Sequence, residues 1–293
     1  MMKQYLSDKQ VKITYHLDKD VVLWISHSVS KTLVHKYFRM KEQVPQMDVI
    51  LLLDGDCEKK NIDLLDGVDF RVFNVDMLNA LGYEPIEETL IPGSNHFVLL
   101  WFFLHNSQYR HYWNIEYDVD FTGDWNLLFR GFQNEPADFI STHIQTYEEV
   151  PNWYWWSSYH GVTLDVPLNQ RIRSFNPIYR ISLAALGFLN RFLKEGNSGH
   201  HEVLIPTVLY SIGLKILDFG GDGSFILPQY KEKFYLSSAI LPDGLKGTMR
   251  DKPNFNSISS YHIFNKLFHP VKKDCWLLSE KNDNSLTELQ ETE

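Results

Sequence analysis

Runs of apolar residues alternate with helix-like segments in the first quarter of the chain. Buried-type strands are predicted at residues 21–26, 48–54 and 70–75. Between the first two, apolar residues recur at helical spacing over residues 28–43, and Pro45 closes that helix. Apolar strands separated by helices are typical of a parallel sheet covered on both faces. The pattern therefore predicts an α/β fold.

The rest of the chain continues with less regular elements. The pattern predicts helices at about 94–107, 125–132, 179–195 and 201–212, and strands at 111–121, 137–142 and 215–219. Residues 244–269 are expected to be mostly loop. Because no linker divides the chain, a single domain is predicted over 1–278. The acidic segment 279–293 lacks periodic apolar positions and is expected to be disordered.

The predicted strand at 111–121 carries the most informative polar pattern. Glu116, Asp118 and Asp120 occupy alternate positions, so an unbroken strand would present them on one face. Three like charges repel each other unless a cation lies among them, and carboxylate oxygens suit Mg²⁺ or Mn²⁺ better than zinc. The alternative is a solvent-facing strand edge with nothing bound. Ligands of open α/β sheets bind at strand carboxyl ends, which favours a metal site.

Charge changes this picture locally. The net charge of −9 argues against general nucleic-acid binding. Residues 244–273 nevertheless hold six Lys or Arg residues against one acid, Asp251, together with His262 and His269. A loop-rich basic segment is either an ordinary basic surface or a lid over a phosphate-bearing ligand. With the acidic strand end, the lid interpretation suits a diphosphate.

Two further groups lie in the second half of the chain. Glu202 follows His200 and His201 at the start of an apolar helix. It either stabilises the helix N-terminus or acts as a general base. The spacing differs from His-Glu-x-x-His, which excludes a zinc hydrolase of that type. The aromatic run at 153–156 is either core or a surface that stacks sugar rings.

Composition bears on the compartment. Residues 1–20 carry no long apolar run, so no signal peptide is expected. The most apolar stretch, 97–104, is too short to span a bilayer. Two cysteines suit a reducing compartment. We therefore expect a cytoplasmic protein without a transmembrane segment, with peripheral membrane contact left open.

The order of these parts resembles a GT-A-type glycosyltransferase that uses a nucleotide sugar. A Rossmann-like half at 21–75 precedes a helix near Asn95, the acidic strand end, a helix that bears Glu202, and the basic segment with His269. The stretch 112–123 (YWNIEYDVDFTG) is similar to a little-characterised microbial group of glycosyltransferases. The resemblance covers about 21–273 and implies a GT-A-like, Rossmann-type mixed sheet flanked by helices.

The resemblance also implies an activity: sugar transfer from a nucleoside diphosphate to a hydroxyl of a glycan or lipid-linked acceptor, metal-assisted and inverting, as in polysaccharide biosynthesis. Mn²⁺ or Mg²⁺ would be held by Asp118, by Glu116 or Asp120, and by His269. Glu202 would be the general base. The nucleotide sugar would contact Asn95, Asp118, Arg250, Lys272 and His262. The acceptor would contact Trp153, Trp155, Trp156 and His201.

Two other functions remain open from the sequence. Paired carboxylates with Mg²⁺ also serve metal-dependent phosphohydrolases and nucleotidyltransferases. A non-catalytic carbohydrate-binding protein built around the tryptophan run is the third possibility. Some GT-A enzymes need no metal, and neither the donor sugar nor the acceptor is specified by these residues.

Overall fold

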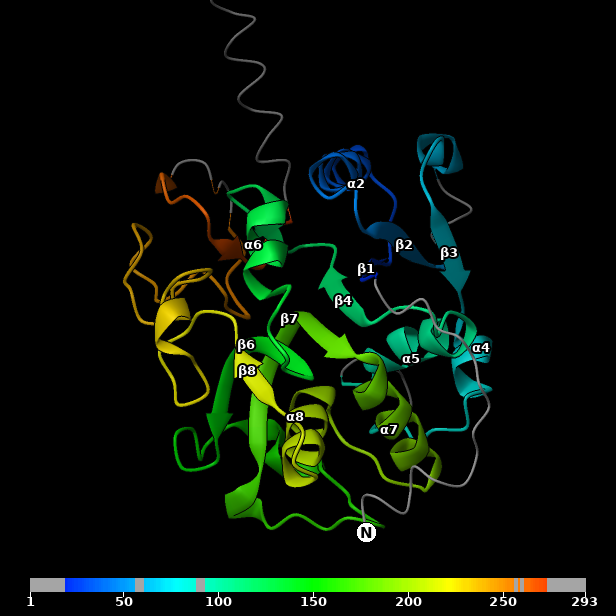
Figure 1. Ribbon diagram of the computed structural model, residues 1–293, viewed down its shortest axis with the longest axis vertical. Coiled ribbons are helices and arrows are strands. Elements are labelled where there is room, and N and C mark those ends of the chain that lie inside the picture. The colour runs from blue at the N-terminus through cyan, green and yellow to red at the C-terminus, as the bar shows by residue number, and fades with distance from the viewer. Residues whose placement is uncertain (1–18, 56–60, 88–92, 256–257, 259–260, 273–293) are drawn as a thin grey trace, which may run out of the picture.

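The computed structural model describes residues 19–55, 61–87, 93–255, 258 and 261–272. Its main sheet has seven strands in the order β3-β2-β1-β4-β7-β6-β8 (Figure 1). These strands are β1 Val21–Ser26, β2 Asp48–Asp54, β3 Phe70–Phe73, β4 His111–Glu116, β6 Phe139–Thr146, β7 Ile172–Ser182 and β8 Ile216–Asp218. A two-stranded sheet joins β5 Asp120–Phe121 to β9 Leu267–Phe268. The predicted tail at 279–293 lies outside the described residues.

Helices cover both faces of the main sheet. They are α2 Lys31–Gln43, α4 Val75–Asn79, α5 His96–His105, α6 Trp125–Phe132, α7 Leu183–Lys194 and α8 His201–Ser211, with short 3₁₀ turns at Ile62–Leu65, Tyr154–Ser158, Leu168–Gln170 and Pro228–Tyr230. Side-chain caps fix several helix starts. Ser30 accepts a hydrogen bond from the Leu33 amide at α2, and Ser182 does the same for Ala185 at α7. The predicted α/β class, with a mixed sheet between helices, is confirmed.

Both faces of β1 are buried, as its continuous apolar run predicted. Val21 and Leu23 pack into one core with residues of α5, α7 and α8. Val22 and Trp24 pack into a second core with residues of α2 and α6. In Figure 1, α2 and α6 accordingly lie above the sheet and α7 and α8 below it. The sheet is the rigid layer on which the candidate site is built.

The topology creates a crevice at the carboxyl ends of β1 and β4. Strand β1 pairs in parallel with β2 on one side and with β4 on the other. The chain runs outward from β1 to β2 and β3, and then returns through α5 to β4. Neighbouring strands whose connections leave in opposite directions leave a gap at their carboxyl ends, where ligands of open α/β sheets bind.

Strand β7 corrects one prediction. We expected a helix over 179–195, but the chain stays extended until Ser182 and only then forms α7. Strand β7 pairs antiparallel with both β4 and β6, which makes the sheet mixed. Its apolar run is interrupted by Arg180, whose guanidinium donates to three backbone carbonyls at 2.5–2.7 Å. Because these backbone carbonyls allow a charged side chain to be buried in the strand, the sequence of β7 does not show the apolar pattern of a buried strand.

The acidic strand end also differs from the prediction. Strand β4 ends at Glu116, a turn follows, and Asp120 begins the separate strand β5. The side-chain alternation of one continuous strand is therefore broken between Glu116 and Asp120.

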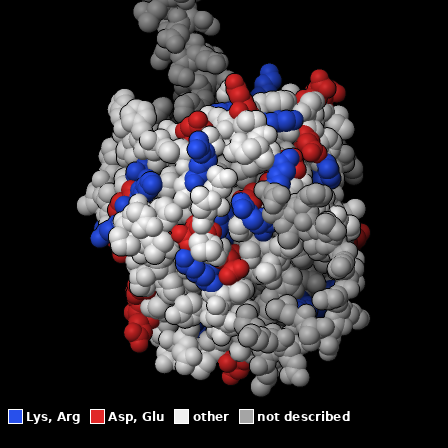
Figure 2. Space-filling view, in the orientation of Figure 1, with Lys and Arg blue, Asp and Glu red and all other residues white. Residues whose placement is uncertain are grey.

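On the face drawn in Figure 2, acidic and basic side chains are interspersed rather than separated. Within the described residues, no helix combines the length and the apolar character needed to cross a membrane.

Candidate metal centre and adjoining cavities

A group of two carboxylates and one imidazole lies at the carboxyl end of β4. Glu116 is the last residue of that strand, and Asp118 lies in the turn after it. His269 comes from the far end of the chain, directly after β9. The β5–β9 ladder pairs Asp120 with Phe268, and the Val271 amide donates to the Asp118 carbonyl at 2.7 Å. These backbone bonds hold the basic C-terminal segment against the acidic turn.

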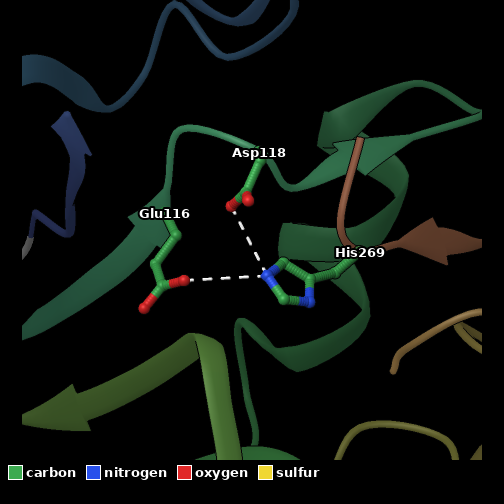
Figure 3. A group of neighbouring side chains, drawn as sticks. All are labelled: Glu116, Asp118 and His269. Atoms are coloured by element: carbon green, nitrogen blue, oxygen red, sulfur yellow. Dashed lines mark ion pairs between the residues drawn. The ribbon is translucent and has the colours of Figure 1, made fainter. Parts of the chain in front are cut away.

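One ring nitrogen of His269 faces both carboxylates (Figure 3). Its Nε2 lies 3.4 Å from Asp118 Oδ1 and 3.7 Å from Glu116 Oε2. Its Nδ1 lies 2.8 Å from the Arg250 carbonyl, which accepts a hydrogen from that nitrogen and fixes the ring orientation. Burial alone would lower the pKa of His269, but hydrogen bonds and charge from Asp118 and Glu116 raise it to about 9. Without a metal, an imidazolium therefore neutralises the two acids.

The same atoms fit a divalent cation. One ligand atom from each of Glu116, Asp118 and His269 lies within 4.8 Å of the others. Asp118 Oδ1 is buried, and the partner that faces it among the described residues is His269 Nε2, 3.4 Å away, which is too long for a strong hydrogen bond. Two hard oxygens and one imidazole would suit a divalent cation such as Mn²⁺ or Mg²⁺. Burial opposes ionisation of Asp118, but His269 and Lys272 keep its pKa below the ordinary value.

Asp120 lies outside this group. Its carboxylate is fully buried, 3.4 Å from Lys36 Nζ and 3.3 Å from Arg39 Nη1, and both bases belong to α2. The turn after β4 rotates Asp120 toward that helix. Of the three alternating acids, the structure brings Glu116 and Asp118 together and pairs Asp120 elsewhere.

A cavity of about 550 Å³, here termed the strand-end cavity, lies on one side of the group. It occupies the crevice at the ends of β1, β2 and β4. The predicted Asn95, Asp118 and Lys272 line it. The Asn95 amide also donates to Glu116 Oε1 at 3.3 Å. Buried oxygens of Ser94, Asn95 and Asn114 in its wall have no hydrogen-bond partner among the described residues, so the wall suits a polar ligand.

A second cavity of about 630 Å³, the aromatic cavity, lies on the other side. Its wall contains the predicted Trp153, Trp155, His201 and Glu202. The two cavities share five lining residues: Asn95, Glu116, His201, Asp251 and His269. The metal group thus forms the boundary between two adjoining binding spaces.

Glu202 lies in the first turn of α8 and faces the aromatic cavity. Burial raises its pKa to about 7, although the Asn176 amide and the Arg173 charge act in the opposite direction. The Asn176 amide donates to its Oε1 at 3.1 Å. Beside it, burial and Arg173 lower the pKa of His200 to about 4, so that imidazole is neutral and its Nδ1 accepts from the Glu202 amide. A carboxylate with this pKa can accept a proton near neutral pH.

The turn at Gly93 brings α5 and α8 together behind the site. Its φ of +95° lies in the region that favours glycine, and a Cβ there would come within 2.7 Å of the His200 ring. Its carbonyl accepts from the His201 amide at 2.9 Å. A larger residue at position 93 would displace the helix start that carries Glu202.

The remaining predicted residues lie in varied places. Arg250 lines the aromatic cavity and pairs with Asp243, whereas His262 is exposed and lines neither cavity. Trp156 is buried in the core and donates to the Val150 carbonyl. Sequence reasoning missed Arg173, because β7 itself was missed.

No family model matches the sequence, and no curated protein is detectably similar to it. Similar solved structures include a protein from Bacillus anthracis assigned as a glucose-1-phosphate thymidylyltransferase (11% identity, 70% of this chain, 87% of the other, TM-score 0.42). Another is the 4-diphosphocytidyl-2C-methyl-D-erythritol synthase of Anaerococcus prevotii (9%, 71%, 91%, 0.38). A third is the galactosyltransferase LgtC with donor and acceptor sugar analogues (8%, 68%, 73%, 0.41). The likeness concerns the fold alone.

Proposed function

We propose that this protein transfers a sugar from a nucleoside diphosphate to a hydroxyl acceptor. One observation carries the proposal: Glu116 and His269 line two adjoining cavities at once, with Glu202 in the wall of only one of them. The donor occupies the strand-end cavity, and the acceptor occupies the aromatic cavity. The resemblance of the sequence to GT-A-type glycosyltransferases supports the same assignment.

In this proposal the donor diphosphate lies next to the metal group. Glu116, Asp118 and His269 would hold Mn²⁺ or Mg²⁺, which would supply Lewis-acid stabilisation of the leaving diphosphate. Lys252 and Lys272 line the strand-end cavity and add positive charge beside the same group. The unpartnered oxygens of Ser94 and Asn114 accept hydrogen bonds from donor hydroxyls.

Glu202 performs the proton transfer. The acceptor oxygen forms a bond to the anomeric carbon as the bond from that carbon to the diphosphate oxygen breaks. The acceptor proton passes to Glu202, whose raised pKa makes it an effective base near neutral pH. Attack from the face opposite the leaving group inverts the anomeric configuration. Trp153 and Trp155 provide rings on which the acceptor sugar stacks.

Product analysis tests the proposal. The protein is incubated with UDP-, GDP-, CMP- and dTDP-linked sugars and Mn²⁺, after a thermal-shift screen selects the nucleotide that stabilises it. We expect release of the nucleoside diphosphate, or of CMP from its donors, together with a glycoside of inverted configuration by NMR. Release of pyrophosphate or free phosphate would instead identify a nucleotidyltransferase or a phosphohydrolase. Glycan binding independent of nucleotide and metal would identify a carbohydrate-binding protein.

A further inference from the structure

Arg173 lies in the wall of the aromatic cavity and forms no ion pair with an acid in the described part of the chain; Glu202 acts on its charge only from beyond ion-pair distance. Arg173 lies on β7, and its guanidinium stacks over the Trp153 ring with 4.8 Å between the guanidinium carbon and the ring centre. Its Nε is buried, and its side chain makes no hydrogen bond or ion pair with any other described residue. A buried polar group in this state, placed in a cavity wall, is available to bind a ligand.

A second guanidinium lines the same cavity. Arg250 uses Nη2 to bind Asp243 at 2.6 Å and Nε to bind the Pro253 carbonyl at 3.1 Å. Its remaining nitrogen, Nη1, is buried without a partner among the described residues. Arg250 is also held by the Phe255 ring, 3.9 Å from the guanidinium carbon. Arg173 and Arg250, each held by an aromatic ring, therefore line the aromatic cavity with hydrogen-bond donors that have no partner among the described residues.

The acids that line the cavity form no ion pair with the Arg173 guanidinium. Glu116 faces His269, and Asp251 is exposed. Glu202 lies beyond ion-pair distance of Arg173; it attracts the guanidinium from there, but its pKa of about 7 leaves it partly neutral. Histidines His200 and His201 are neutral, because burial lowers their pKa values. An incoming oxyanion would thus meet the guanidinium of Arg173, which forms no ion pair with a described residue, and the unpartnered Nη1 of Arg250, whose Nη2 is bound to Asp243.

We propose that the acceptor bound in the aromatic cavity is an anionic sugar whose carboxylate or phosphate is bound by Arg173, with Arg250 as the second donor. A planar guanidinium binds a carboxylate or a phosphate through paired N–H donors. A neutral hydroxyl gains nothing from the positive charge of the guanidinium. Stacking on the Trp153 ring holds the Arg173 guanidinium in position before the ligand binds. The acceptor role rests on the proposed function, but anion binding in this cavity does not.

Calorimetric binding with simple sugars tests the proposal. The probes are methyl glucuronide, glucose 6-phosphate and methyl glucoside, each titrated into the full chain. We expect at least one anionic probe to bind about tenfold or more tightly than methyl glucoside, and Arg173→Gln to remove that preference. Arg173→Lys keeps the positive charge but loses the paired N–H donors of the guanidinium, so it should retain only part of the preference for the anionic probe. The choice between glucuronide and phosphate identifies the oxyanion.

Arg71→Gln is the matched control, since Arg71 is exposed on β3, pairs with Asp69 and lines neither cavity. It should leave all three affinities unchanged. Equal binding of charged and neutral probes, absence of binding by all three, or an unchanged preference in a folded Arg173→Gln variant would overturn the proposal. An Arg173-dependent preference without sugar transfer would refute the proposed function and leave anion binding intact. Sugar transfer to neutral acceptors alone would support the proposed function and refute the anionic acceptor.

Discussion

At the scale of single residues, the segment after β4 contains two acids with different surroundings, one in the site and one outside it. Asp118 is buried beside His269, whose Nε2 lies 3.4 Å from its Oδ1. Asp120, two positions later, is buried between Lys36 and Arg39. The first arrangement leaves a ligand position available, and the second is closed by charges from the protein itself. The same substitution at the two positions therefore separates function from stability.

Asp118→Asn should abolish sugar transfer and weaken Mn²⁺ binding while the protein stays folded. The amide keeps the shape of the side chain but removes the charge that a hard cation requires. Manganese titration followed by electron paramagnetic resonance measures the affinity, and circular dichroism checks the fold. Full turnover in this variant would exclude Asp118 from the metal site.

Asp120→Asn should have the opposite effect. Removing one partner of a buried ion pair leaves Lys36 uncompensated and costs about 3–5 kcal/mol of stability. Manganese affinity measured on the folded protein should stay close to that of the wild type. Urea unfolding gives the stability difference. A stable variant that no longer binds manganese would place Asp120 in the metal shell and contradict the geometry.

Glu202 determines the expected pH dependence. A general base must be ionised, and burial raises its pKa to about 7, so kcat/KM should rise with pH and level off above that value. One pH unit below the pKa, activity should be about one-tenth of the plateau. The groups that act on Glu202 are Arg173, Glu116, Asp251 and the Asn176 amide. Because Arg173 lowers this pKa, Arg173→Gln should move the rise to higher pH, and Glu202→Gln should remove the activity.

At the scale of elements, the sequence was informative where apolar patterns were unbroken. Strands β1 and β2 and helix α6 have the predicted bounds, since each buries a regular apolar set. Strand β7 could not be read, because Arg173, Asn176 and Arg180 interrupt it and each is accommodated by tertiary contacts. Missing β7 meant missing Arg173. The turn that separates Asp120 from Glu116 was equally hidden, since alternation of charge continues across it.

The segment that carries His269 has its own small core. Phe268 packs with Leu241, Phe255, Ile258 and Val271, apart from the two cores of the main sheet. Phe268→Ala should loosen this segment, because truncating a buried phenylalanine costs about 3–5 kcal/mol. We expect faster hydrogen exchange at residues 267–271 and weaker manganese binding.

Phe264→Ala is the control for that experiment, since its side chain is 72% exposed. It should change neither the exchange rates nor the metal affinity. If Phe268→Ala left both quantities at their wild-type values, the small core around Phe268 would not be what holds His269 in place.

At the scale of the whole molecule, the two cavities adjoin at a boundary formed in part by Glu116 and His269. Donor and acceptor can therefore occupy the protein together, and direct displacement needs no covalent sugar–enzyme intermediate. Initial rates measured while both substrates are varied should give intersecting double-reciprocal lines. Parallel lines would instead indicate a ping-pong mechanism with a covalent intermediate. In that case Glu202 would have to be reassigned from general base to nucleophile.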